Sequence, residues 1–117
     1  MSKTLAVAAI AAVASIGATG TAAARTYYAS VGPGMTIKVL NAAGKKISSV
    51  KKGAVTIRVR DKSRAHNFHL EGPGSLNRKT TIPFLGLKTW KITLKAGLYT
   101  YRCDAHPRTM RGSFRAS

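Results

Sequence analysis

The chain has 117 residues and a formal net charge of +17, because it has 20 lysines and arginines but only three aspartates and glutamates. So few carboxylates offer no pair of acids for general acid–base chemistry, which argues against a hydrolytic enzyme. A single cysteine excludes an internal disulfide, on which small exported domains often depend. We therefore expect a binding or carrier protein and not an enzyme.

The first 24 residues have the features of a cleaved signal peptide. Lys3 gives a short positive start, residues 5–16 form a nearly unbroken apolar run, and residues 22–24 (Ala-Ala-Ala) match an Ala-x-Ala cleavage site. Because a membrane-spanning helix needs about 20 apolar residues, an uncleaved anchor is the weaker alternative. The expected product is residues 25–117, exported to a periplasm, the cell exterior or the cell wall. It has no transmembrane segment, and the loss of Lys3 leaves a charge of +16.

The mature chain is expected to form a single all-β domain. Alternating apolar and polar residues, separated by glycine-containing turns, predict strands over residues 35–40, 54–60, 66–70, 89–95, 98–103 and 112–116. The last of these is expected to pair as a closing edge, and residues 75–87 alternate poorly and predict a loop or a short irregular element. Since no useful length shows helical periodicity, the pattern favours a β-sandwich or a barrel.

The positive charge is expected to cover the outside of this domain. Arg58 and Arg60 oppose the apolar face of one predicted strand, and Lys91 and Lys95 oppose that of another, whose Trp90 is expected in the core. The simplest interpretation is a soluble cationic surface, and the next is a surface that attracts an anionic partner. Nucleic acid is not expected as the partner, because export removes most opportunity and no basic–aromatic module is present.

Three side chains with metal-binding chemistry lie within eight residues, at the end of a predicted strand. They are Cys103, His106 and Met110, and Pro107 helps the chain to turn between them. A thiolate, an imidazole and a thioether form the soft and borderline ligand set that copper prefers. A short loop of this kind leaves little room for a water ligand, and one more imidazole would complete a site of two histidines and one cysteine with a weak axial methionine.

The second imidazole is expected from residues 66–70, which contain two histidines. His66 and His69 are three residues apart, so on a strand they would point to opposite faces and would not both reach one metal. We favour His66 and expect His69 to be partly exposed or near the edge of the site. The alternatives are that Cys103 is a buried apolar residue without a metal, or that the site holds structural zinc. Methionine is not a usual zinc ligand, which favours copper.

Two segments resemble the copper-binding segments of the cupredoxins, the plastocyanin and azurin family. One is Tyr-Thr-Tyr-Arg-Cys-Asp-Ala-His at residues 99–106, followed by Met-Arg-Gly-Ser-Phe at 110–114; the other is Ala-His-Asn-Phe at 65–68. The resemblance extends over nearly all of residues 35–116. It implies a Greek-key β-sandwich with one type 1 (blue) copper ion that cycles between Cu(I) and Cu(II). The implied ligands are His66, Cys103, His106 and, in the axial position, Met110. It also implies that Asn67 ties the two ligand segments together by hydrogen bonds.

These features predict an exported, monomeric carrier of single electrons that meets an anionic redox partner protein or an anionic surface. The alternative is a periplasmic or cell-wall copper buffer or delivery protein without a redox partner. A closed site favours the carrier, because delivery needs an accessible metal. We also expect Arg102, Arg108 and Arg111, which lie close to the ligands in sequence, to favour the less positive reduced copper and so to raise the reduction potential.

Overall fold

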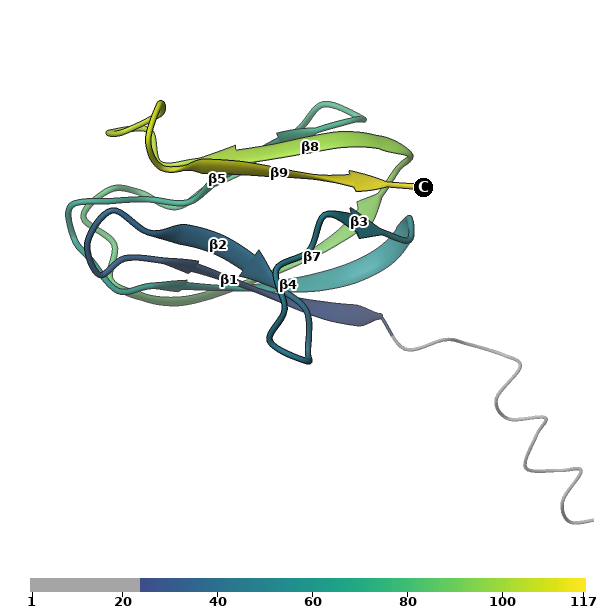
Figure 1. Ribbon diagram of the computed structural model, residues 1–117, viewed down its shortest axis with the longest axis horizontal. Coiled ribbons are helices and arrows are strands. Elements are labelled where there is room, and N and C mark those ends of the chain that lie inside the picture. Colours follow the sequence, from purple (N-terminus) through teal and green to yellow (C-terminus); the bar gives the residue numbers. More distant parts are fainter. Residues whose placement is uncertain (1–23) are drawn as a thin grey trace, which may run out of the picture.

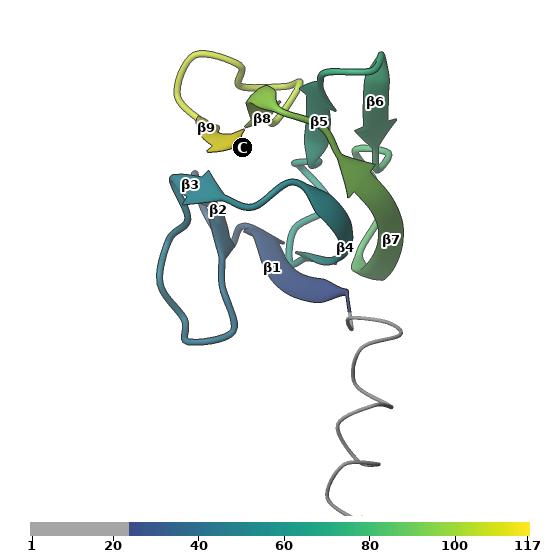
Figure 2. The same cartoon turned by 90° about the vertical axis from the view of Figure 1, so that its right-hand side faces the viewer.

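A computed structural model describes residues 24–117 as a sandwich of two β-sheets, which Figure 2 shows as separate layers. Nearly all of the predicted signal peptide, residues 1–24, lies outside the described residues. The strands are β1 (Arg25–Val31), β2 (Ile37–Leu40), β3 (Ser49–Val50), β4 (Gly53–Asp61), β5 (His69–Gly72), β6 (Leu76–Lys79), β7 (Gly86–Leu94), β8 (Gly97–Arg102) and β9 (Arg111–Ala116). Residues 24–117 contain no helix that is long and apolar enough to span a membrane.

The strands divide between the sheets in an order that requires several crossings. One sheet has the order β2-β1-β4-β7 and the other β3-β9-β8-β5-β6. The chain passes between the sheets five times: between β2 and β3, β3 and β4, β4 and β5, β6 and β7, and β7 and β8. Most neighbours are antiparallel, but β1 pairs with β4 in parallel, as β3 does with β9. The predicted all-β sandwich is confirmed.

Several strand predictions need correction. β1 was not predicted, because its inward side chains include the small Ala29 and so give a weak apolar alternation. Residues 75–87 were expected to form a loop or a short irregular element, but they contain β6 and the start of β7. β6 is an edge strand whose residues are largely exposed, so it needs few apolar side chains. The predicted closing edge, β9, lies inside its sheet, and the short β3 is the edge.

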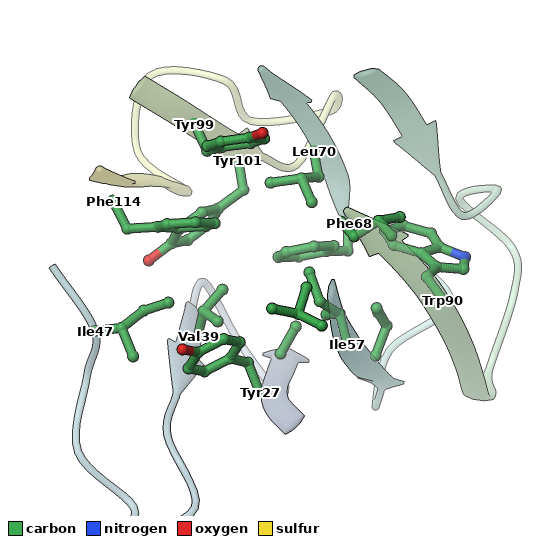
Figure 3. Close-up of a cluster of buried hydrophobic side chains, with 14 of the residues drawn as sticks. Tyr27, Val39, Ile47, Ile57, Phe68, Leu70, Trp90, Tyr99, Tyr101 and Phe114 are labelled. Carbon is green, nitrogen blue, oxygen red and sulfur yellow. The ribbon is translucent and has the colours of Figure 1, made fainter. Parts of the chain in front are cut away.

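The core lies between the sheets and is rich in aromatic side chains (Figure 3). Phe68 lies at its centre, fully buried, with its ring stacked on Tyr101 at a centroid distance of 5.5 Å and 6.0 Å from the ring of Trp90. Tyr99 and Phe114 stack in parallel at 5.3 Å. The expectation that Trp90 is a core residue is confirmed, since it is 7% exposed.

Two glycines on neighbouring strands lie directly under tyrosine rings of β8. The ring of Tyr99 covers Gly72, and the ring of Tyr101 covers Gly112, so closely that a Cβ atom at either glycine would overlap the ring. The hydroxyl of Tyr99 also accepts a hydrogen bond of 2.8 Å from the backbone N–H of Lys95. These contacts fix β8 between β5 and β9, and β8 leads directly into Cys103.

Strand register brings four loops to one end of the sandwich. Val31 and Gly86 are both paired with Asp61, and His69 is paired with Arg102. The loops that adjoin these pairs therefore share an end: residues 32–36, 62–68, 80–85 and 103–110. In Figure 1 this end is on the left, and the C-terminus is at the opposite end. All the predicted ligands are in two of these loops.

Candidate metal centre

The loop after β8 is closed by its own backbone. The N–H of His106 donates to the carbonyl of Cys103 (3.1 Å), and the N–H of Met110 donates to the carbonyl of His106 (2.9 Å). The N–H of Cys103 in turn donates to the carbonyl of Met110 (2.9 Å), which joins the two ends of the loop. Cys103 and Met110 are fully buried, whereas His106 is half-buried. Local hydrogen bonds thus hold three candidate ligands in one tight turn.

The segment that contains His66 is held by hydrogen bonds to Thr80, which belongs to a different loop. The N–H of Phe68 donates to the hydroxyl of Thr80 (3.0 Å), and the N–H of Thr80 donates to the carbonyl of Phe68 (3.0 Å). These bonds replace the strand ladder, so β5 begins only at His69. The predicted strand over residues 66–70 is therefore wrong at its start, although Phe68 and Leu70 are both fully buried.

Three of the four predicted ligands meet at one point. The Sγ of Cys103 lies 3.7 Å from Nδ1 of His66 and 3.9 Å from Nδ1 of His106. One ligand atom from each of the three residues lies within 4.8 Å of the other two. The imidazole rings are 4.9 Å apart and inclined at 68°. The axial role of Met110 stays a prediction; its side chain is buried at the end of the same loop.

The separations suit a metal ion bound between these side chains. With bond lengths of about 2.3 Å to sulfur and about 2.0 Å to nitrogen, as for zinc, a trigonal arrangement puts the two atoms about 3.7 Å apart and a tetrahedral one about 3.5 Å apart. The observed sulfur–nitrogen distances of 3.7 and 3.9 Å are close to both values and leave room for one ion. A trigonal site of two histidines and one cysteine is typical of copper.

Asn67 connects the two ligand segments. Its side-chain N–H groups donate to the Asp104 carboxylate (2.9 Å) and to the Thr80 carbonyl (3.0 Å), and its side-chain oxygen accepts the backbone N–H of Asp104 (2.7 Å). Its own backbone N–H points at the Sγ of Cys103, 3.4 Å away. Asn67 therefore makes the links that the resemblance implied, and it adds a donor to the sulfur.

His69 lies near the edge of the site, which is one of its two expected positions, but it is not partly exposed. It is only 6% exposed, and β5 lies inside its sheet, between β8 and β6. Its ring is not part of the His66–Cys103–His106 cluster. Instead, Nδ1 lies 2.8 Å from Asp104 Oδ1 and Nε2 lies 2.6 Å from Asn77 Oδ1. Asn77 and Thr80 were not predicted as partners, because both fall in residues 75–87, which show no strand pattern.

Charged partners surround Arg102, which pairs with Glu71 (2.6 Å) and with Asp104 (3.2 Å). The hydrogen bond from Arg102 lowers the pKa of Glu71. Burial by itself would raise the pKa of Asp104, but hydrogen bonds from His69 and Asn67 and the nearby positive charges lower it overall. The two carboxylates offset the charge of Arg102. Arg102 was expected to raise the positive potential near the ligands, and this pairing reduces that effect.

Comparison with known proteins identifies the fold. No family model and no curated protein matches the chain. Solved structures do match: reduced auracyanin from Roseiflexus castenholzii (TM-score 0.58, 19% identity, covering 82% of this chain and 99% of that one) and the "blue" copper protein auracyanin A from Chloroflexus aurantiacus (0.51, 21%, 81% and 100%). A mutant of amicyanin in the Cu(I) state also matches (0.54, 21%, 79% and 82%). At these identities, the likeness establishes a shared fold.

Proposed function

We propose that this protein, whose fold is cupredoxin-like, is a carrier of single electrons with one type 1 copper ion. The ligands would be His66, Cys103 and His106, with Met110 as a weak axial fourth. One observation carries this proposal: a fully buried cysteine sulfur lies between two imidazole nitrogens at distances of 3.7 and 3.9 Å. The structural neighbours, described as copper proteins in Cu(I) or oxidised states, support the same assignment.

The surroundings of the cluster suit electron transfer. A bound copper ion would supply the chemistry by alternating between Cu(I) and Cu(II). Cys103 is 0% and His66 6% exposed, so these side chains exclude water; the closed loop holds Cys103, and the hydrogen bonds between Phe68 and Thr80 hold the segment of His66. The N–H of Asn67 stabilises negative charge on the sulfur. Ligands that do not rearrange between oxidation states keep the structural cost of electron exchange low.

We place the path of the electron at His106, the half-buried ligand. Cys103 and His66 are covered, so the imidazole of His106 gives the most direct route to the surface. Three large apolar side chains in loops at the same end of the sandwich are exposed: Met35 (50%), Ile82 (38%) and Leu85 (47%). Exposed apolar side chains at the same end as the half-buried ligand suit a short-lived contact with a redox partner.

The partner is expected to be anionic, and the protein to act as a monomer. Lys62, Arg64 and Arg108 are exposed in the loops of the ligand end. Of the three carboxylates in the chain, Glu71 and Asp104 pair with Arg102, and Asp61 is buried. Electron transfer to hexacyanoferrate(III) should therefore slow as salt is added, and transfer to a cationic cobalt complex should accelerate. The opposite salt dependence would reject an anionic partner.

The protein is also proposed to be exported. Residues 1–24 would be removed as a signal peptide, and residues 25–117 would be the working domain in a periplasm, cell wall or extracellular space. The described strands support this boundary, because β1 begins at Arg25. The mass of the protein recovered from outside the cytoplasm would test it: a species that begins at Arg25 is expected.

The test of the copper assignment is a titration with Cu(II), followed by visible and EPR spectroscopy. An intense thiolate-to-copper band at one equivalent is expected, lost in Cys103→Ser and in His66→Ala. His69→Ala should keep the band, because His69 lies outside the cluster. A colourless protein that binds zinc would reject the proposal in favour of a structural metal site.

The copper buffer or delivery function is the second candidate, favoured by the partial exposure of His106. An exposed ligand would let copper leave to an acceptor. The rate at which a Cu(I) chelator removes the metal separates the two functions. Removal within seconds at micromolar chelator would support delivery, and removal over many hours would support the carrier.

A further inference from the structure

His69 is a buried imidazole that the proposed copper site does not use as a ligand. It begins β5 and is 6% exposed. Both ring nitrogens have close polar partners, Asp104 at 2.8 Å and Asn77 at 2.6 Å. Because an ionised carboxylate can only accept, Nδ1 carries the hydrogen and donates it to Asp104. The ring is therefore held by its hydrogen bond to Asp104, and its other nitrogen faces the side chain of Asn77.

Asp104 connects His69 to Asn67, which lies next to the metal-binding cluster. Its Oδ1 accepts from His69, and its Oδ2 accepts the side-chain N–H of Asn67 at 2.9 Å. Its backbone N–H donates to the side-chain oxygen of Asn67 at 2.7 Å. Asp104 and Asn67 thus form a ring of two hydrogen bonds, and His69 holds the carboxylate on its far side.

The chain of contacts ends on the cysteine sulfur. Asn67, held by Asp104 and by the carbonyl of Thr80, has its backbone N–H 3.4 Å from Cys103 Sγ. A hydrogen bond to a thiolate withdraws electron density from the sulfur, and such bonds tune the reduction potential of copper–thiolate centres. A small displacement of Asn67 would change both the length and the angle of this bond.

The region around His69 and Arg102 holds most of the acidic residues of the chain. The protein has three acidic residues against 20 basic ones, and two of the three, Glu71 and Asp104, lie around His69 and Arg102. The pKa values of both carboxyls are lowered, so both are ionised at neutral pH. In a strongly basic protein, two of the three carboxylates therefore lie close to the segment that contains Cys103.

We propose that His69 is a positioning residue for the metal centre: by holding Asp104 against Asn67, it sets the N–H···S hydrogen bond to Cys103. This inference rests on the proposed copper function. Removal of outer hydrogen-bond partners of metal ligands typically weakens metal binding about 10–100-fold. We expect an effect of this size when His69 can no longer donate to Asp104.

The test uses two substitutions of nearly the same shape. In His69→Asn, the side-chain amide nitrogen takes the position of Nδ1 and keeps a donor toward Asp104. In His69→Leu, the branching at Cγ is kept and the donor is lost. The copper-loaded leucine variant should keep a thiolate band but shift it, lower the reduction potential, and weaken copper affinity about 10–100-fold. The asparagine variant should lie close to the unaltered protein in all three.

A control separates positioning from general destabilisation of β5. Leu70→Val weakens the same strand from its core side, where Leu70 is 0% exposed, and should leave the band and the potential unchanged. In the metal-free protein, the amide proton of Asp104, which donates to Asn67, should exchange faster in His69→Leu than in His69→Asn. This measurement does not depend on copper.

The outcomes distinguish this inference from the copper assignment. If the unaltered protein gives no thiolate band, the proposed function is wrong. If it gives the band and His69→Leu matches it in band position, potential and affinity, the positioning role is wrong. Equal changes in Leu70→Val and His69→Leu would also overturn it, because they would trace the effect to the strand and not to the hydrogen bond.

Discussion

The two segments that bring histidines to the candidate site are held in different ways. The segment before β5 depends on distant parts of the chain: Phe68 is packed in the core, and Thr80 supplies its backbone partners. The loop after β8 is held by hydrogen bonds among Cys103, His106 and Met110 themselves. The difference means that His66 needs the whole sandwich, whereas the turn around His106 is specified largely by eight consecutive residues.

The largest expected difference concerns replacement of each histidine by glycine. In His106→Gly, added imidazole should restore the thiolate-to-copper band, because His106 is half-buried and its place can be reached from solvent. In His66→Gly, imidazole should restore little, since His66 is 6% exposed and lies under the protein surface. Titration of both variants with imidazole measures this, and equal recovery would contradict the distinction.

Phe68→Ala should break the segment that depends on tertiary packing. Loss of a large buried aromatic side chain typically costs about 3–5 kcal/mol, and Phe68 is 0% exposed. Denaturant unfolding of the metal-free protein measures the loss. Tyr28→Ala, an aromatic truncation on the outer face where Tyr28 is 41% exposed, is the control and should cost far less. Similar costs would show that Phe68 is not an anchor.

Acid should weaken the link between the two segments. Asp104 and Glu71 have ordinary pKa values of 3.8 and 4.5, which the folded protein lowers. Their contribution is therefore complete above the ordinary values and is lost as the pH falls through the lowered ones. The melting temperature of the metal-free protein should fall below about pH 4.5. Asp61, whose pKa burial raises, acts in the opposite sense.

The double variant Glu71→Gln, Asp104→Asn is the matched comparison for the acid effect. It keeps the shapes of both side chains and removes their titration, while Asp61 is unchanged. Its melting temperature should be lower at neutral pH but should change less between pH 5 and pH 3. An equally steep fall in the double variant would assign the acid sensitivity to other groups.

The smallest expected effects are the changes in reduction potential on replacing the arginines near the ligands. Arg108→Gln and Arg111→Gln should each lower the reduction potential slightly, because an exposed positive charge that disfavours Cu(II) is removed. Arg102→Gln should have a smaller effect through charge alone, since Glu71 and Asp104 offset its charge. Potentiometry at two ionic strengths tests this: the changes for Arg108 and Arg111 should shrink in high salt.

The same contrast explains what the sequence could predict. Spacing alone identified Cys103, His106 and Met110 as a group, because they lie in one turn held by local hydrogen bonds. The argument that His66 and His69 cannot share a metal assumed that both lie on a strand, yet residues 66–68 precede β5; the preference for His66 came from the asparagine that follows it, as in the resemblance. The role of Thr80 could not be predicted, since no local pattern indicates a partner 12 residues away.

The strands show a similar limit. Long strands with one buried face, such as β4, give a clear alternation and were predicted closely. The edge strand β6 buries little and has almost no apolar pattern, so its position follows from pairing with β5 and not from its own residues. Likewise, burial of His69 follows from the neighbours that cover β5, which the sequence of β5 alone does not contain.

The tyrosine–glycine pairs of β8 limit the order in which this sequence can change over time. Because the rings of Tyr99 and Tyr101 occupy the space above Gly72 and Gly112, a side chain at either glycine is acceptable only after the facing tyrosine has become smaller. The two positions of each pair are thus epistatic: the tyrosine can be replaced before the glycine, but the glycine cannot be replaced before the tyrosine. Related sequences that lack one of these glycines should therefore also lack the tyrosine that covers it.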